Sequence, residues 1–137
     1  MSEPIASILF LCVHNAGRSQ MAAAFARQIG AGRVEVWSAG SSPAETLNPA
    51  VVEAMAEVGI DISAESPRRL SEQMGLDADV IVTMGCGDAC PVYPNKRYLD
   101  WELVDPAGKS LGEVRAIRDD IKARVKALID ELSRAGS

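Results

Sequence analysis

The sequence predicts an α/β fold in which a parallel sheet is covered by helices on both faces. Residues 8–11 are a short, continuously apolar run and residues 80–83 are a short β-branched run, the patterns of strands that are buried on both faces. A third run, residues 34–38, alternates apolar and polar side chains, and apolar stripes at helical spacing separate the runs. Strands that alternate with helices favour a parallel sheet. The 137 residues are enough for a single domain over residues 1–137 with one buried core.

Two helices are predicted between these strands. Residues 19–29 carry apolar side chains near one face of a helix. In the second helix, Asn48 is a suitable N-cap and Pro49 is suited to the first turn. The apolar stripe that follows stops at Gly59, a residue type that commonly ends helices.

The last helix is the clearest predicted element, because Ser110 and Glu113 form a capping box at its start. Apolar residues then recur at spacings of three or four: Leu111, Val114, Ile117, Ile121, Val125, Leu128 and Leu132. The opposite face carries charged residues that we expect to be solvated: Glu113, Arg115, Arg118, Asp119, Lys122 and Lys126. We also expect a short fourth strand within residues 96–101 and loops at residues 41–47 and 88–94.

Charge and composition exclude several classes of function. The formal net charge of −5 argues against a nucleic-acid partner, because neutralising phosphates requires a basic surface. No apolar run approaches the roughly 20 residues of a membrane span, so we expect no membrane partner. The first residues lack the basic patch and long apolar stretch of a secretory signal, so we expect a cytoplasmic protein. Three cysteines, an odd number, suggest working thiols in such a reducing compartment.

The stretch Cys-x5-Arg-Ser predicts an anion-binding loop. Cys12 ends the first predicted strand, and ligands of parallel sheets bind beyond the carboxyl ends of the strands. A loop that curls ahead of a helix can point its backbone N–H groups inward. Gly17 permits an unusual turn, and Arg18 offers a planar fork that grips an oxyanion at two points. The predicted anion-binding residues are Val13, His14, Asn15, Ala16, Gly17 and Arg18.

The same surroundings predict a nucleophilic role for Cys12. A helix N-terminus and a nearby cation favour the thiolate form of a cysteine, so we expect Cys12 to be largely ionised at neutral pH. Ser19 could hydrogen-bond that thiolate and hold it. A buried structural cysteine is the alternative, but the strand, loop and helix around Cys12 favour the functional interpretation.

At this point the sequence resembles a known family. "LCVHNAGRS" is similar to the phosphate-loop signature of the low-molecular-weight phosphotyrosine phosphatases, a group that also contains thiol-linked arsenate reductases. The likeness extends through "SAGSSPAETLNPAVVEAMAEVGIDIS" to an Asp-Pro pair, Asp105-Pro106, and covers nearly the whole chain. It implies a flavodoxin-like three-layer sandwich with a four-stranded parallel sheet and helices on both faces.

The other two cysteines distinguish between the activities of this group. Cys86 and Cys90 follow the third predicted strand, at the same sheet edge as Cys12. A phosphatase needs one thiolate and water, whereas reduction of arsenate to arsenite needs at least two thiols. The resemblance to the arsenate reductases implies a relay in which a disulfide passes from Cys12–Cys86 to Cys86–Cys90 and is reduced by thioredoxin. Arsenate is the expected substrate, with phosphate or sulfate as competing oxyanions.

The resemblance also implies that Asp105 is the general acid that protonates the departing oxygen. In the phosphatases this Asp-Pro is usually followed closely by aromatic residues that stack on the substrate ring. Here Ala107, Gly108 and Lys109 follow, which suits a small inorganic anion.

Other interpretations remain open on the sequence alone. The protein could be a low-molecular-weight phosphatase, or a sensor that binds an oxyanion without catalysis. An arsenate transferase linked to mycothiol resembles this sequence less, because that branch typically keeps only the first cysteine. A zinc site is a weaker interpretation, since the spacing of Cys86 and Cys90 is unusual and the only histidine, His14, lies in the predicted anion loop. We expect no metal and no cofactor.

Overall fold

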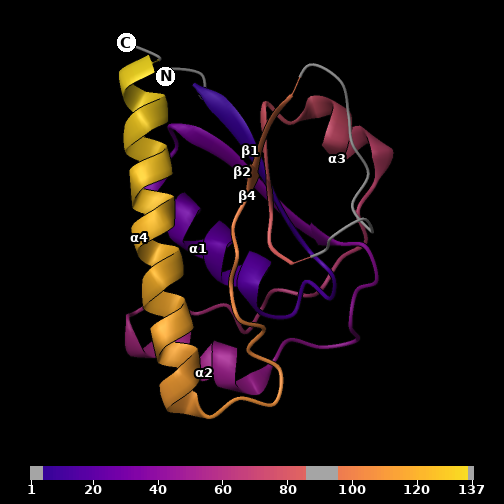
Figure 1. Ribbon diagram of the computed structural model, residues 1–137, viewed down its shortest axis with the longest axis vertical. Coiled ribbons are helices and arrows are strands. Elements are labelled where there is room, and N and C mark those ends of the chain that lie inside the picture. Colours follow the sequence, from indigo (N-terminus) through magenta and orange to yellow (C-terminus); the bar gives the residue numbers. More distant parts are fainter. Residues whose placement is uncertain (1–4, 86–95, 136–137) are drawn as a thin grey trace.

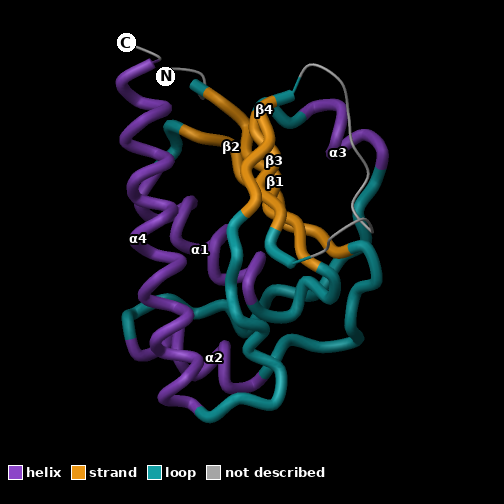
Figure 2. Tube along the Cα trace, viewed as in Figure 1, coloured by secondary structure: helices purple, strands orange, loops and turns teal. Residues whose placement is uncertain are grey.

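The computed structural model describes residues 5–85 and 96–135. A parallel sheet of four strands forms its centre, in the order β2-β1-β3-β4. The strands are β1 (Ala6–Cys12), β2 (Val34–Gly40), β3 (Val80–Thr83) and β4 (Arg97–Asp100). Figures 1 and 2 show the four strands side by side in the middle of the molecule. The predicted α/β class and parallel sheet are therefore confirmed.

Helices cover both faces of the sheet, but unequally. Three of them, α1 (Arg18–Gly30), α2 (Pro49–Glu57) and α4 (Leu111–Ala135), share one core with one face of the sheet. The short α3 (Glu72–Asp77) lies on the other side, as Figure 1 shows. The sequence did not reveal α3, since six residues are too few to show an apolar period. The Ser71 hydroxyl caps this helix by accepting from the Met74 amide.

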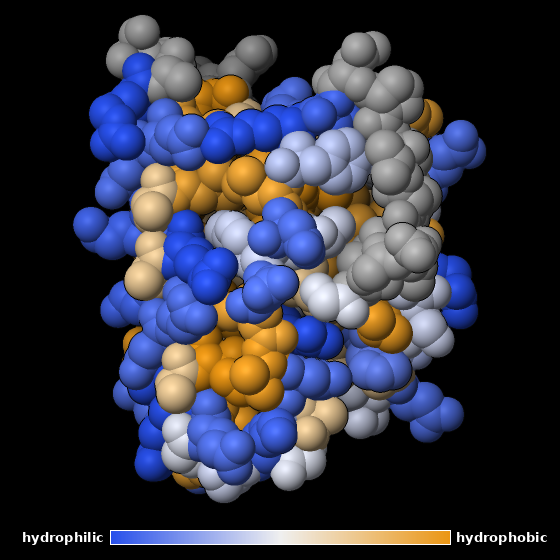
Figure 3. Space-filling model, in the orientation of Figure 1, coloured by the Kyte–Doolittle hydropathy of each residue, from blue (hydrophilic) through white to orange (hydrophobic). Residues whose placement is uncertain are grey.

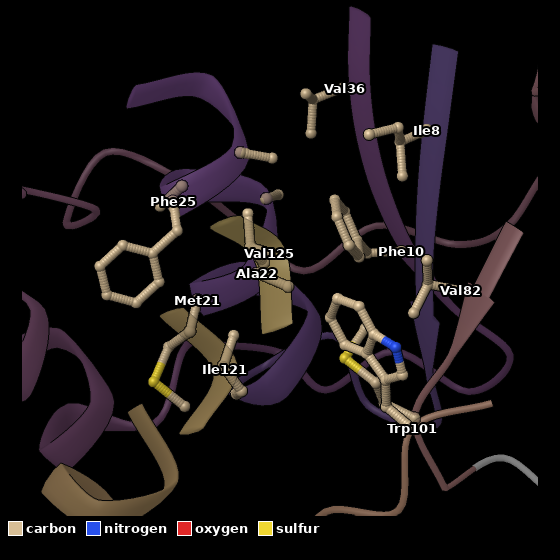
Figure 4. Packing of buried hydrophobic residues seen from close by; sticks show 14 of the residues in the cluster. Ile8, Phe10, Met21, Ala22, Phe25, Val36, Val82, Trp101, Ile121 and Val125 are labelled. Carbon is tan, nitrogen blue, oxygen red and sulfur yellow. The ribbon is translucent and has the colours of Figure 1, made fainter. Parts of the chain in front are cut away.

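The alternating side chains of β1 divide the core into two layers. Ile8 and Phe10 point into the larger cluster with α1 and α4, whereas Leu9 and Leu11 belong to the smaller cluster with Ile81. Figure 4 shows the larger cluster, in which the Phe10 and Trp101 rings lie 6.0 Å apart. Burial on both faces explains why β1 is continuously apolar from Ile8 to Leu11. No helix in the described ranges is both long and apolar enough to cross a membrane.

The last helix begins as the sequence predicts. The Ser110 hydroxyl accepts from the Glu113 amide, and the Glu113 carboxylate accepts from the Ser110 amide, so the capping box is formed. Hydrophilic residues cover much of the surface along α4 in Figure 3. Arg118 departs from the expected solvated face, because it is only 8% exposed. Its guanidinium donates to the Ala54 carbonyl oxygen and to the Glu57 carboxylate, which ties α4 to α2.

We predict that Glu57 makes the stability of this helix pair dependent on pH. The Arg115 guanidinium, with a smaller contribution from Arg118, lowers the pKa of the Glu57 carboxyl below its usual 4.5. The ionised carboxylate therefore stabilises the fold above pH 4.5, and this contribution is lost as pH falls through the lowered pKa. Glu57→Gln should be less stable than the wild type to urea at pH 7, and the difference should shrink by pH 3. Arg115→Gln should show the same trend, and a difference equal at both pH values would contradict this assignment.

Candidate active site

The predicted anion loop lies where β1 ends and α1 begins. Cys12 is the last residue of β1, and Arg18 is the first of α1, so residues 13–17 form the connection at the carboxyl edge of the sheet. Cys12 is in register with Gly40 at the end of β2. A Cβ atom at Gly40 would lie 2.6 Å from the Val13 carbonyl oxygen, so only glycine allows β2 to approach the loop this closely.

The segment after β2 holds the loop from outside. The amides of Ser42, Ala44 and Asn48 donate to the carbonyl oxygens of Val13, His14 and Ala16, at 2.8, 2.9 and 3.0 Å. In a trans peptide the N–H group points away from the carbonyl. The carbonyls are thus turned towards this outer segment, and the N–H groups of the same peptides face the opposite side. This arrangement makes an amide-lined cup that suits an anion.

Cys12 lies at the floor of this cup, with its residue only 2% exposed. The Asn15 amide donates to its sulfur at 3.2 Å, and the Ser19 Oγ lies 2.9 Å from the sulfur. Because Asn15 Nδ2 donates to Ser19 Oγ at 2.7 Å, the Ser19 proton is available to the sulfur. Two donors aimed at one sulfur suit a thiolate, which acts only as an acceptor.

Asn15 organises the loop through both backbone and side chain. Its φ of 51° places it in the left-handed region that asparagine tolerates. Its Oδ1 accepts from the Arg68 amide and from Gln20 Nε2, at 2.9 and 3.1 Å. Gln20 is 1% exposed and also donates to the Ser66 carbonyl oxygen. Sequence reasoning missed Gln20, although a glutamine among the apolar residues of α1 was a usable signal.

Arg18 and Asp105 meet at the rim of the cup. The Arg18 guanidinium lies 3.6 Å from the Asp105 carboxylate and donates to the Leu103 carbonyl oxygen at 3.3 Å. The Arg18 side chain is 8% exposed and that of Asp105 is 48% exposed. Asp105 Oδ1 also accepts from the Ala107 amide at 3.0 Å, which fixes the turn that carries it. The structure therefore brings the predicted cation and the predicted acid to one place.

A cavity of about 160 Å³ opens above Cys12. The described residues that line it are Cys12, His14, Ala16, Gly17, Arg18, Ala44, Asn48, Asp105, Pro106 and Ala107. None of these lining residues is Phe, Tyr or Trp. His14 lies at the exposed rim, with Nδ1 3.3 Å from the Ser42 carbonyl oxygen. The small walls and the guanidinium suit a compact tetrahedral anion.

Asn48 joins three parts of the site, a role that the sequence did not reveal. Its backbone amide donates to Ala16 in the anion loop, and its Oδ1 caps α2 by accepting from the Ala50 amide. Its Nδ2 donates to the Pro106 carbonyl oxygen at 3.3 Å. Pro106 also packs against the anion loop, because a Cβ atom at Gly17 would lie 2.7 Å from Pro106 Cγ. Asn48 therefore supports both the acid-bearing turn and the anion loop.

Cys86 and Cys90 lie outside the described residues, as does the predicted loop at residues 88–94. The chain is described as far as Gly85, the residue that precedes Cys86. Within the described ranges, no group of three or more His, Cys, Asp or Glu side chains is placed to hold a metal ion.

The parallel sheet and the cysteine loop at its carboxyl edge define a class of α/β proteins that hold a buried thiol beneath an oxyanion-sized cavity. Comparison with known proteins agrees with this class. The chain belongs to the low molecular weight phosphotyrosine protein phosphatase family, whose sequence profile matches residues 7–137. The resemblance noted in the sequence is therefore confirmed.

The most similar proteins include arsenate reductases. The glutaredoxin arsenate reductase of Synechocystis sp. is 37% identical over 129 residues, which cover 92% of this chain and 98% of that protein. The thioredoxin-dependent arsenate reductase Cg_ArsC1' of Corynebacterium glutamicum is 41% identical, with a TM-score of 0.82 over 96% of this chain. This chain spans only 63% of the length of that structure. An arsenate reductase in a phosphate-binding state is 36% identical, with a TM-score of 0.83 over 93% of this chain and 98% of that one.

Proposed function

We propose that this protein reduces arsenate to arsenite, with Cys12 as the nucleophile. The observation that carries this proposal is the cup itself, in which Cys12 lies under an amide-lined loop beside Arg18 and Asp105. The similarity to arsenate reductases along most of the chain supports the same reaction. The absence of Phe, Tyr and Trp from the described cavity lining favours a small inorganic anion over an aryl phosphate.

In the first step the Cys12 thiolate attacks arsenic. An As–S bond forms and one arsenate oxygen leaves as water after it is protonated. Asp105 supplies the proton, and general acid catalysis of this kind contributes roughly 10²–10⁴ in rate. The Arg18 guanidinium and the loop amides stabilise the negative charge of the remaining oxygens.

The next steps transfer two electrons from thiols to arsenic. The Cys86 thiolate attacks the Cys12 sulfur, the As–S bond breaks, and its electron pair remains on arsenic, which leaves as arsenite. A Cys12–Cys86 disulfide results. The Cys90 thiolate then attacks Cys86, which releases Cys12 as a thiolate and leaves a Cys86–Cys90 disulfide. Two thiols are oxidised for each arsenic atom reduced, so the electrons balance.

An external dithiol must then reduce the Cys86–Cys90 disulfide. We propose thioredoxin, which the name of the Corynebacterium glutamicum relative supports. The proposal places the protein in a reducing cytoplasm, where its three thiols would otherwise stay reduced.

Direct speciation of arsenic tests this function. The protein is incubated with arsenate, thioredoxin, thioredoxin reductase and NADPH, and arsenite is separated from arsenate and quantified. We expect arsenite and oxidised NADP in equal amounts. Cleavage of p-nitrophenyl phosphate without any arsenite would instead assign a phosphatase, because the same thiolate forms a phosphocysteine that water hydrolyses. Phosphate binding without either reaction would assign an oxyanion sensor.

Asn48→Ser should remove the hydrogen bond to the acid-bearing turn while it keeps the N-cap of α2. Serine is as good an N-cap as asparagine, so the free energy of unfolding should fall only by the roughly 0.5–1.5 kcal/mol of the one lost hydrogen bond. Serine is too short to donate to the Pro106 carbonyl oxygen. The net free energy of one such hydrogen bond is equivalent to about a two- to tenfold change in an equilibrium or rate constant. We therefore expect kcat for arsenate reduction to fall by about two- to tenfold.

Asn48→Ala is the matched control, because alanine loses both the cap and the donor. It should show the same fall in kcat and be roughly 1 kcal/mol less stable than Asn48→Ser, because the cap is lost as well. Unchanged kcat in Asn48→Ser would show that the contact with Pro106 does not position the acid.

A further inference from the structure

We propose that Gly85 is a positioning residue for Arg18, and that its lack of a side chain sets the place of the guanidinium at the anion cup. The inference rests on the proposed function only in taking the cup as an oxyanion site. Gly85 follows β3 at the carboxyl edge of the sheet and has a φ of +82°. A Cβ atom built there would lie 2.4 Å from Arg18 Nη1 and 3.2 Å from Arg18 Cζ.

The guanidinium is thus packed directly against the backbone of Gly85. The guanidinium also donates to the Leu103 carbonyl oxygen and lies 3.6 Å from the Asp105 carboxylate. Because the Arg18 side chain is only 8% exposed, the open space beside it is the cavity above Cys12, where the anion would bind. A methyl group at position 85 must therefore displace the guanidinium from these partners.

Displacement is cheaper than unfolding, since the clashing atoms are the end of a long side chain. The energetic consequence therefore falls on anion binding more than on the fold. Arg18 lines the cavity above Cys12 and supplies a charge-assisted fork to an oxyanion. Gly85 thereby determines where the anion is gripped relative to the sulfur, without contacting the anion itself.

A second glycine provides a matched control for backbone strain. Gly59 also has a φ of +82°, but a Cβ atom there has no neighbour within 4 Å among the described residues. It lies beyond the end of α2 and does not line the cup. Gly59→Ala and Gly85→Ala thus carry the same conformational penalty, and only the second forces a contact with Arg18.

The experiment measures phosphate binding by NMR titration, which follows affinities into the millimolar range. We expect Gly85→Ala to raise the Kd by about ten- to a hundredfold, the range for a lost charge-assisted hydrogen bond. Gly59→Ala should bind as the wild type does, while both variants should show similar midpoints of urea unfolding. Equal phosphate affinity in the two variants would overturn the proposal.

A second pair of variants tests whether the effect passes through Arg18. Lysine at position 18 keeps the charge but lacks the Nη1 atom that a Cβ at Gly85 would strike. In the Arg18→Lys background, Gly85→Ala should change the Kd by less than about threefold, because the two sites are coupled. The same ten- to hundredfold loss in that background would contradict the role assigned to Gly85. Phosphate binding needs no arsenate, so a failure of the proposed reaction would leave this result interpretable.

Discussion

Replacing Cys12 with serine is expected to abolish arsenate reduction while preserving oxyanion binding. The serine hydroxyl is a much weaker nucleophile than a thiolate, and no As–S bond can form, so turnover should fall by more than about a thousandfold. The donors of the cup come from backbone amides and Arg18, which the substitution leaves in place. Removal of a negative sulfur from the floor should, if anything, favour the bound anion.

Phosphate titration of Cys12→Ser provides the necessary control. We expect a Kd within about threefold of the wild-type value or lower, since the substitution removes no donor from the cup. Lost phosphate binding together with lost turnover would show that the sulfur organises the loop, through its contacts with Asn15 and Ser19. Measurable reduction by the variant would exclude Cys12 as the nucleophile.

Cys86→Ser and Cys90→Ser should each stop multiple turnovers with thioredoxin, but at different points of the relay. Without Cys86, the adduct on Cys12 has no resolving thiol, and we expect no arsenite. Without Cys90, Cys86 can still attack Cys12, so each protein molecule should release one arsenite and then stop as a Cys12–Cys86 disulfide. Steady-state rates of both variants should fall by more than about a hundredfold.

A burst of arsenite distinguishes the two variants. Pre-reduced protein is mixed with excess arsenate without thioredoxin, and arsenite is quantified against protein. We expect one equivalent from Cys90→Ser and none from Cys86→Ser. Equal yields from the two variants would contradict the assigned order of attack, and arsenite from Cys86→Ser alone would reverse it. Normal thioredoxin-coupled turnover in both would rule out the relay.

The sequence predicts the sheet and the major helices well because their signals are local. The apolar run of β1 reflects burial on both faces, and the capping box of α4 lies within four residues. The anion loop is similarly local, since Cys12 and Arg18 lie on one continuous stretch between a strand and a helix. The phosphatase-family resemblance adds Asp105, which no local pattern would separate from an ordinary turn.

The residues that hold the site in place could not be predicted from local sequence patterns, because their roles depend on contacts between distant segments. Asn48 is recognisable as a helix cap, but its bond to Pro106 spans 58 positions of the chain. The role proposed for Gly85 can be recognised only in the folded structure, where Arg18 packs against it. Arg118 was expected on a solvated face, yet the Ala54 carbonyl and the Glu57 carboxylate draw it between α4 and α2.

The central claim is that thiols of this chain reduce arsenate through a disulfide that ends on Cys86 and Cys90. Peptide mapping by mass spectrometry after a single turnover of the wild-type protein tests it most directly, with free thiols alkylated before digestion. The account predicts one arsenite for each protein molecule, an alkylated Cys12, and a disulfide between Cys86 and Cys90. Arsenite without that disulfide, or three alkylated cysteines and no arsenite, would contradict it.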